Sequence, residues 1–107
     1  MKYHNSRTVV DDIKFDSKKE ASRYLELKML EKAGKITNLE LQVPFDLVPA
    51  IKINGRTNRK VVYVADFVYF DENGKRVVED VKGVKTDVYK LKKKLMAWIY
   101  NIDILET

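Results

Sequence analysis

The chain has 107 residues, 45% of them hydrophobic, which is enough for one domain with a modest core. It has no cysteine, which excludes disulfides and thiolate metal sites, and it has no apolar run that approaches a membrane span. We therefore expect a protein of the cytoplasm, and the net charge of +5 favours a polyanionic partner such as nucleic acid.

Residues 1–16 are largely polar and basic, and we interpret them as an N-terminal arm that ends in a short strand or turn. His4, in this arm, has no ligand-type residues near it and is expected to be an exposed side chain and not a metal ligand. Residues 17–107 are expected to form a single domain.

The first helix is expected to begin at Ser17, with Glu20 three residues later completing a capping box, and to end before Gly34. Its apolar side consists of Ala21, Tyr24, Leu25, Leu27 and Leu30. Glu20 thus has a purely structural explanation, although helical spacing also places it on the inward side of the helix.

Residues 36–43 alternate weakly and then meet Pro44, which predicts an extended segment that leads into an edge strand. Residues 45–53, interrupted by Pro49, predict a second strand that is either irregular or at a sheet edge. Asn54 and Gly55 then begin a polar turn that runs to Lys60 and includes Arg56. This basic loop either contacts DNA or is a solvated hairpin tip.

The stretch from Val61 to Phe70 is apolar and β-branched, as in a strand covered on both faces, yet Asp66 lies in its middle. An ionised acid there costs several kcal/mol unless a partner compensates it. The following strand offers Glu79, Asp80 and Lys82 as candidates.

The turn at residues 71–75 decides which candidate faces Asp66. A three-residue loop with Gly74 in the left-handed conformation pairs Asp66 with Asp80 and brings Lys82 to the same side. A two-residue turn shifts the register by one and places Glu79 beside Asp66 instead. We prefer the three-residue loop, because two carboxylates and a lysine on one surface suit metal-assisted hydrolysis. The alternative role of this group is an Asp66–Lys82 salt bridge.

The second helix is expected to begin after Thr86 or Asp87 and to face the sheet with Val88, Leu91, Leu95, Trp98 and Ile99. Lysines cover its other side, with only Asp87 to oppose them, which favours phosphate contact over a merely solvated surface. Residues 102–105 then form a last strand. The order αβββαβ predicts an α/β (α+β) fold, with a mixed sheet flanked by helices and the last strand parallel to its neighbour.

Asp66, the Asp80-Val81-Lys82 sequence fourteen residues later, and a first helix that contains Glu20 resemble the signature of the PD-(D/E)XK nuclease superfamily. Ala65 replaces the proline that commonly precedes the first acid. The whole chain resembles a small phage-encoded family of unknown function, and it is similar to the nuclease domains of four-way (Holliday) junction resolvases and of a transposase endonuclease subunit. Gln42 occupies a position that resembles a glutamine frequent in such nucleases, with no role assigned.

The resemblance implies a restriction-endonuclease-like core and a DNA endonuclease that uses Mg²⁺, with Mn²⁺ as an alternative. Asp66 and Asp80 would bind the metal together with the Val81 carbonyl and Glu20, and Lys82 would position water or stabilise phosphate charge. The residues expected to hold the DNA backbone are Lys85, Lys90, Lys93, Lys94 and Arg56.

One such site cuts one strand, so a paired cut, as in a branched junction, implies a homodimer. Nicking or processing of replication intermediates is the nearest rival activity. A non-catalytic nucleic-acid-binding module on the same fold is the alternative of a different class.

Overall fold

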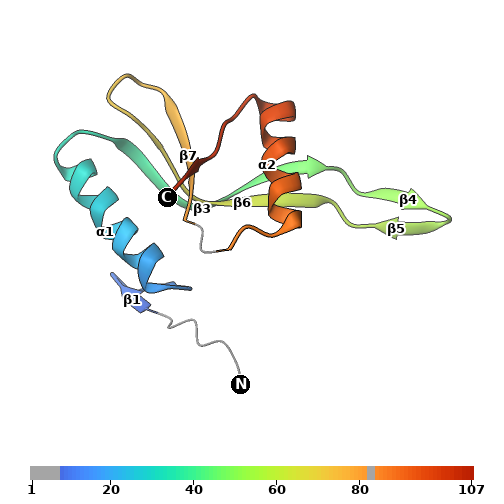
Figure 1. Ribbon diagram of the computed structural model, residues 1–107, viewed down its shortest axis with the longest axis horizontal. Helices are drawn as coiled ribbons and strands as arrows, with labels where there is room; N and C mark the ends of the chain where they lie inside the picture. Colours follow the sequence, from blue (N-terminus) through green and yellow to red (C-terminus); the bar gives the residue numbers. More distant parts are fainter. Residues whose placement is uncertain (1–7, 82–83) are drawn as a thin grey trace.

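The computed structural model describes residues 8–81 and 84–107. Their main sheet is mixed and four-stranded, with a helix before and a helix after its hairpin (Figure 1), and two small hairpins lie outside it. The sheet has the order β3-β6-β7-β8, and its strands are β3 (Thr37–Val48), β6 (Val61–Phe70), β7 (Arg76–Asp80) and β8 (Leu105–Glu106). β3, β6 and β7 are antiparallel, and β8 is parallel to β7. With α1 (Lys18–Lys32) before β3 and α2 (Asp87–Tyr100) before β8, the predicted αβββαβ order and α+β class are confirmed.

Helix α1 begins as the capping residues predict. The Ser17 Oγ accepts the Glu20 N–H at 3.1 Å, and Gly34 follows the C-cap residue Ala33 with a φ of +76°. The helix buries Ala21, Tyr24 and Leu27. Leu25 and Leu30 were predicted for the same side, and this is wrong, because both are exposed.

The later part of the predicted N-terminal arm is a hairpin of β1 (Thr8–Val10) and β2 (Ile13–Phe15) that packs against α1. The Phe15 and Tyr24 rings have centroids 5.1 Å apart, and the Tyr24 hydroxyl donates to Asp11 at 2.9 Å. His4 lies outside the described residues.

Residues 36–43 were predicted to lead into an edge strand, and β3 is indeed at the sheet edge, but the predicted break before residues 45–53 is wrong, because β3 runs through Pro44, which lies opposite Val64. β3 is an edge strand, so the missing N–H can face away from β6 without breaking the ladder. The predicted polar turn does begin at Asn54 and is a hairpin tip, but it is shorter than the predicted stretch to Lys60. Asn54 and Gly55 alone make the turn of a second hairpin, of β4 (Ile51–Ile53) and β5 (Arg56–Asn58), which projects beyond the sheet (Figure 1).

The β6–β7 turn has the three-residue form. The Asp71 N–H donates to the Lys75 carbonyl at 2.9 Å, and Gly74 has a φ of +78°. Phe67 lies opposite Glu79, and the same register continued by one residue places Asp66 opposite Asp80. The preferred register is therefore confirmed, and Glu79 lies on the other side of the strand from Asp80.

Each helix covers its own apolar cluster, and β6 contributes to both. The α1 cluster consists of Phe15, Ala21, Tyr24, Leu27, Ile36, Phe67 and Tyr69. The α2 cluster consists of Phe45, Leu47, Tyr63, Ala65, Val68, Val78, Tyr89, Met96 and Ile104. In the sequence of β6, Asp66 lies between Ala65 of the α2 cluster and Phe67 of the α1 cluster.

Helix α2 faces the sheet with different residues from those predicted. It is capped by Thr86, whose Oγ1 accepts the Tyr89 N–H at 3.1 Å, and it buries Tyr89 and Met96, with Leu95 partly buried. The other four predicted core positions are exposed: Val88, Leu91, Trp98 and Ile99. Trp98 lies nine residues from Tyr89 and therefore on the opposite side of the helix.

Candidate active site

Two carboxylates meet between β6 and β7. The Asp66 Oδ2 accepts the Val81 N–H at 2.8 Å, and the Asp80 Oδ2 accepts the Tyr63 hydroxyl at 2.8 Å. Asp80 is only 2% exposed. Burial, and then the neighbouring Asp80 carboxyl, raise the pKa of Asp66 to about 7, against the opposing effect of the Val81 N–H. The pair thus bears less negative charge at neutral pH than two ordinary aspartates.

Gln42 connects this pair to Glu20 on α1. Its amide nitrogen lies 3.2 Å from Glu20 Oε2 and 3.4 Å from Asp66 Oδ1, and the Glu20 side chain is buried. Gln42 has a φ of +52°, a left-handed conformation that a non-glycine residue rarely adopts within a strand. Four elements, α1, β3, β6 and β7, therefore bring polar groups to one place.

A cavity of about 310 Å³ opens beside the two aspartates. Its wall consists of Val62, Tyr63, Val64, Asp66, Asp80, Thr86, Val88, Tyr89 and Lys92. Lys92 is the one cationic side chain of this wall within the described part of the chain. It was not among the lysines predicted to bind nucleic acid, but it follows the buried Tyr89 by three residues, which is nearly one helical turn. Tyr63 gave no sequence signal beyond its place in an apolar strand.

Carboxylate oxygens such as those of Asp66 and Asp80 suit a hard divalent cation. The geometry limits how many acids can bind it directly. Two neighbouring acids, one with a raised pKa, form a site whose repulsion a divalent cation would relieve. Among residues 8–81 and 84–107, no group of three or more acidic or histidine side chains is close enough to hold a metal ion. Glu20 is joined to Asp66 through the Gln42 amide, so it fits as an outer group. Lys82 lies outside the described residues.

The predicted phosphate-binding lysines divide into paired and unpaired residues. Glu106 on β8 binds Lys85 at 2.9 Å and Lys93 at 3.3 Å. The Tyr89 hydroxyl donates to Glu106 at 2.6 Å and, together with these lysines, lowers the pKa of Glu106 to about 2. The expectation that only Asp87 opposes the lysines is therefore wrong, because the parallel return of the chain to β8 brings a distant acid to α2.

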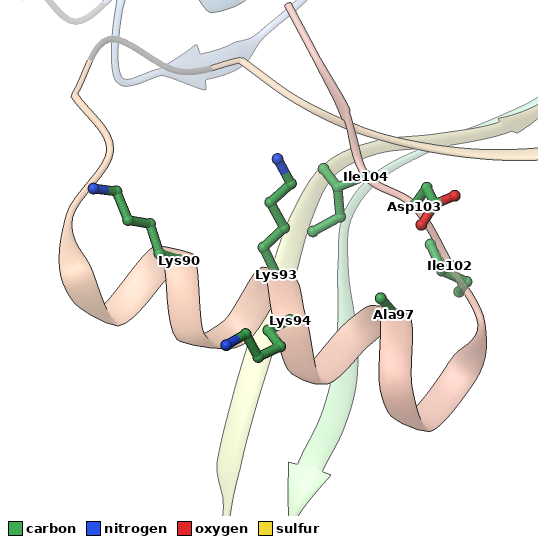
Figure 2. A pocket seen from close by; sticks show the side chains of 7 residues that line it. All are labelled: Lys90, Lys93, Lys94, Ala97, Ile102, Asp103 and Ile104. Atoms are coloured by element: carbon green, nitrogen blue, oxygen red, sulfur yellow. The ribbon is translucent and has the colours of Figure 1, made fainter.

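Lys90 and Lys94 make no ion pair with any residue that the structure describes. Together with Lys93 they border a hollow of about 560 Å³ between α2 and the segment Ile102–Ile104 (Figure 2). Arg56 lies elsewhere, on the projecting β4–β5 hairpin. The predicted nucleic-acid-binding residues thus form two separate groups.

Glu79, the acid that the alternative register would have placed beside Asp66, is held by hydrogen bonds that stabilise the fold. It is fully buried and accepts hydrogen bonds from Arg23, from the Tyr69 hydroxyl at 2.7 Å and from Thr107 Oγ1 at 3.1 Å. The hydrogen bond from Arg23 to Glu79 raises the pKa of Arg23 above the ordinary range. Burial, and then the hydrogen bond to Glu79, raise the pKa of Tyr69 to about 12. Glu79 therefore joins α1 to the sheet and does not contribute to the aspartate pair.

Residues 1–104 match the model of a protein family described as "Protein of unknown function (DUF1064)". The chain belongs to the DUF1064 family. No curated protein and no solved structure matches this DUF1064 chain. Neither helix in the described portion of the DUF1064 chain has the length and apolar character needed to cross a membrane.

The raised pKa of Asp66 predicts a pH-dependent cost to folding in this DUF1064 chain. Between the unfolded pKa near 4 and the folded value of about 7, the folded state binds more protons, so stability falls as pH rises. Asp66→Asn is expected to stabilise the chain by about 1–2 kcal/mol at pH 8, after allowance for solvent screening, and by almost nothing near pH 4.

Urea unfolding in EDTA at pH 4, 6 and 8 measures this difference. Glu72→Gln, on the exposed β6–β7 turn, is the matched change of carboxylate to amide and should show no comparable trend. A variant Asp66→Asn that is less stable than the wild type at pH 8 would show that the site favours the ionised carboxylate.

Proposed function

We propose that the chain is a divalent-metal-dependent DNA endonuclease of the PD-(D/E)XK type. The observation that carries this proposal is the placement of Asp66 opposite Asp80 across the β6–β7 hairpin, beside a cavity that Lys92 also lines. Charged groups of both signs around one opening suit the hydrolysis of a phosphodiester, in which a nucleophile is generated and phosphate charge is stabilised.

Each residue has a role in this proposal. Asp66 and Asp80, with the Val81 carbonyl, would hold Mg²⁺ or Mn²⁺, and Glu20 would act on the outer side of the site. A bound divalent cation supplies Lewis acidity toward the scissile phosphate and lowers the pKa of water. Lys82 would position water, and Lys92 would stabilise the negative charge that develops on the phosphate.

Two further residues would orient the carboxylates. Gln42 donates toward both Glu20 and Asp66 and thereby fixes their spacing. Tyr63 donates to Asp80 and keeps that carboxylate in one orientation. Partners of this kind typically change metal affinity or activity by about 10- to 100-fold when they are removed.

The proposed substrate is DNA, preferably branched, held through its backbone by the lysines of α2. A junction requires a paired cut, so the chain would act as a homodimer. The nearest rival activity is nicking or processing of replication intermediates. One observation favours a non-catalytic DNA-binding module instead, which is that no three-acid group exists among the described residues.

A panel of matched substrates tests these possibilities. The purified chain is incubated with a four-way junction, a flap, a linear duplex and a single strand, each with Mg²⁺, Mn²⁺ or EDTA. We expect cleavage only with metal and fastest on the junction. Equal rates on junction and linear duplex would remove the preference for branches, and DNA binding without any cleavage would establish the non-catalytic module.

A further inference from the structure

The β4–β5 hairpin and the residues that flank it, together residues 49–60, form a projecting ribbon. This ribbon carries only positive charge. Its strand residues are all exposed, and the segment contains Lys52, Arg56, Arg59 and Lys60 but no acid. Lys60 pairs with Asp46 at 3.4 Å. The other three cations make no ion pair within residues 8–81 and 84–107. The ribbon is therefore an uncompensated cationic surface.

The backbone of the ribbon is regular. Asn54 and Gly55, with φ values of 52° and 77°, form a two-residue turn that pairs Ile53 with Arg56. Alternation along the strands places Ile51, Ile53 and Arg56 on one face and Lys52 on the other. A two-stranded hairpin with both faces in water is only marginally stable by itself. Its shape and charge suit a partner that encloses both faces.

We propose that this ribbon lies in a groove of duplex DNA, about one helical turn from the aspartate pair. The inference rests on the proposed function in taking DNA as the partner. The major groove, about 12 Å wide, admits a two-stranded β-ribbon, and the phosphates on its two sides match cations on both faces. A second copy of the ribbon would instead bring like charges together.

The spacing follows from strand geometry. Arg56 and Asp66 are ten positions apart in the sequence, and at about 3.3 Å per position this distance is at most about 33 Å. One turn of B-form DNA is about 34 Å. β4 and β5 continue the direction of β3 and β6 away from the sheet (Figure 1), so a duplex along β6 would run from the aspartates to the ribbon. Ile51 and Ile53 would then contact sugars or thymine methyl groups.

Fluorescence anisotropy in EDTA tests the proposal without requiring cleavage. The double variant R56Q/R59Q is compared with K32Q/K35Q, which removes the same charge from exposed lysines around the end of α1, far from the ribbon (Figure 1). On a 30-base-pair duplex we expect R56Q/R59Q to weaken binding at least about tenfold. The slope of log affinity against log salt should fall by about two. K32Q/K35Q should change affinity less than about threefold.

Duplex length provides the decisive comparison. On a duplex of about 8 base pairs, too short to reach both the aspartates and the ribbon, the difference in affinity between the wild type and R56Q/R59Q should be much smaller than on 30 base pairs. If the wild type binds DNA and R56Q/R59Q behaves like K32Q/K35Q at every length, the ribbon proposal is overturned and the endonuclease proposal stands. If the wild type binds no DNA, both fail. The double variant with Ile51→Ser and Ile53→Ser tests the remaining possibility. If sedimentation shows that the wild type is a dimer and this variant a monomer, and if DNA affinity is unchanged, the ribbon is an interface between two copies of the chain and the ribbon proposal is overturned.

Discussion

Replacing Asp80 with asparagine is expected to reduce Mg²⁺-dependent DNA cleavage at least about a hundredfold, the usual scale for loss of one electrostatic group from a reaction centre. Asparagine keeps the size of the side chain and an oxygen that can accept the Tyr63 hydroxyl, so the fold should be retained. The negative charge opposite Asp66 is lost. DNA affinity in EDTA should be unchanged or slightly tighter, because a repulsive charge near the phosphate has been removed.

Initial cleavage rates over a range of Mg²⁺ concentrations, with anisotropy for binding, measure the two effects separately. Glu72→Gln is the control for the loss of one carboxylate, and it should cleave like the wild type. Lys92→Gln in the same assay should slow cleavage more than it weakens binding. Wild-type cleavage by Asp80→Asn would contradict the assignment of the aspartate pair as the active site.

The second large effect concerns stability. Arg23→Met should destabilise the chain by about 3–5 kcal/mol, because it leaves the fully buried Glu79 without its cation. Glu79→Leu with Arg23→Met should recover much of this loss, since no isolated charge then remains in the interior. Urea unfolding measured by circular dichroism gives the free energies.

Glu26→Gln is the control for the other ion pair of Arg23, which is 3.7 Å long and exposed on the Glu26 side, and should cost less than about 0.5 kcal/mol. A loss below about 1 kcal/mol in Arg23→Met would show that Tyr69 and Thr107 suffice to satisfy Glu79, contrary to the argument from charge.

The site was predictable from the sequence where turn chemistry determines geometry. Residues 71–75 allow a three-residue or a two-residue turn, and each turn fixes which residue lies opposite Asp66, but the choice of the three-residue turn came from the chemistry of the facing side chains. The capping residues Ser17 and Thr86 likewise determined where both helices begin. These are local effects, and they need no knowledge of distant contacts.

The remaining features depend on tertiary contacts that periodicity does not encode. A proline is tolerated within β3 only because that strand is at the sheet edge. The buried side of α2 is determined by Tyr89 and Met96, which pack in the α2 cluster. The larger predicted stripe, which includes Trp98, does not determine it. Glu106 meets Lys85 and Lys93 through the parallel pairing of β8. The Gln42 bridge requires a backbone conformation that the identity of the residue does not suggest.

The backbone at Gln42 determines which substitutions can separate the two contributions of this residue. Alanine would remove the amide and also face the steric penalty of a positive φ, so the strand would tend to revert to its ordinary conformation and draw its neighbours out of register. Glycine accepts that conformation without penalty. Gln42→Gly therefore deletes the link between the first helix and the central strand while leaving the local path of the chain unaltered.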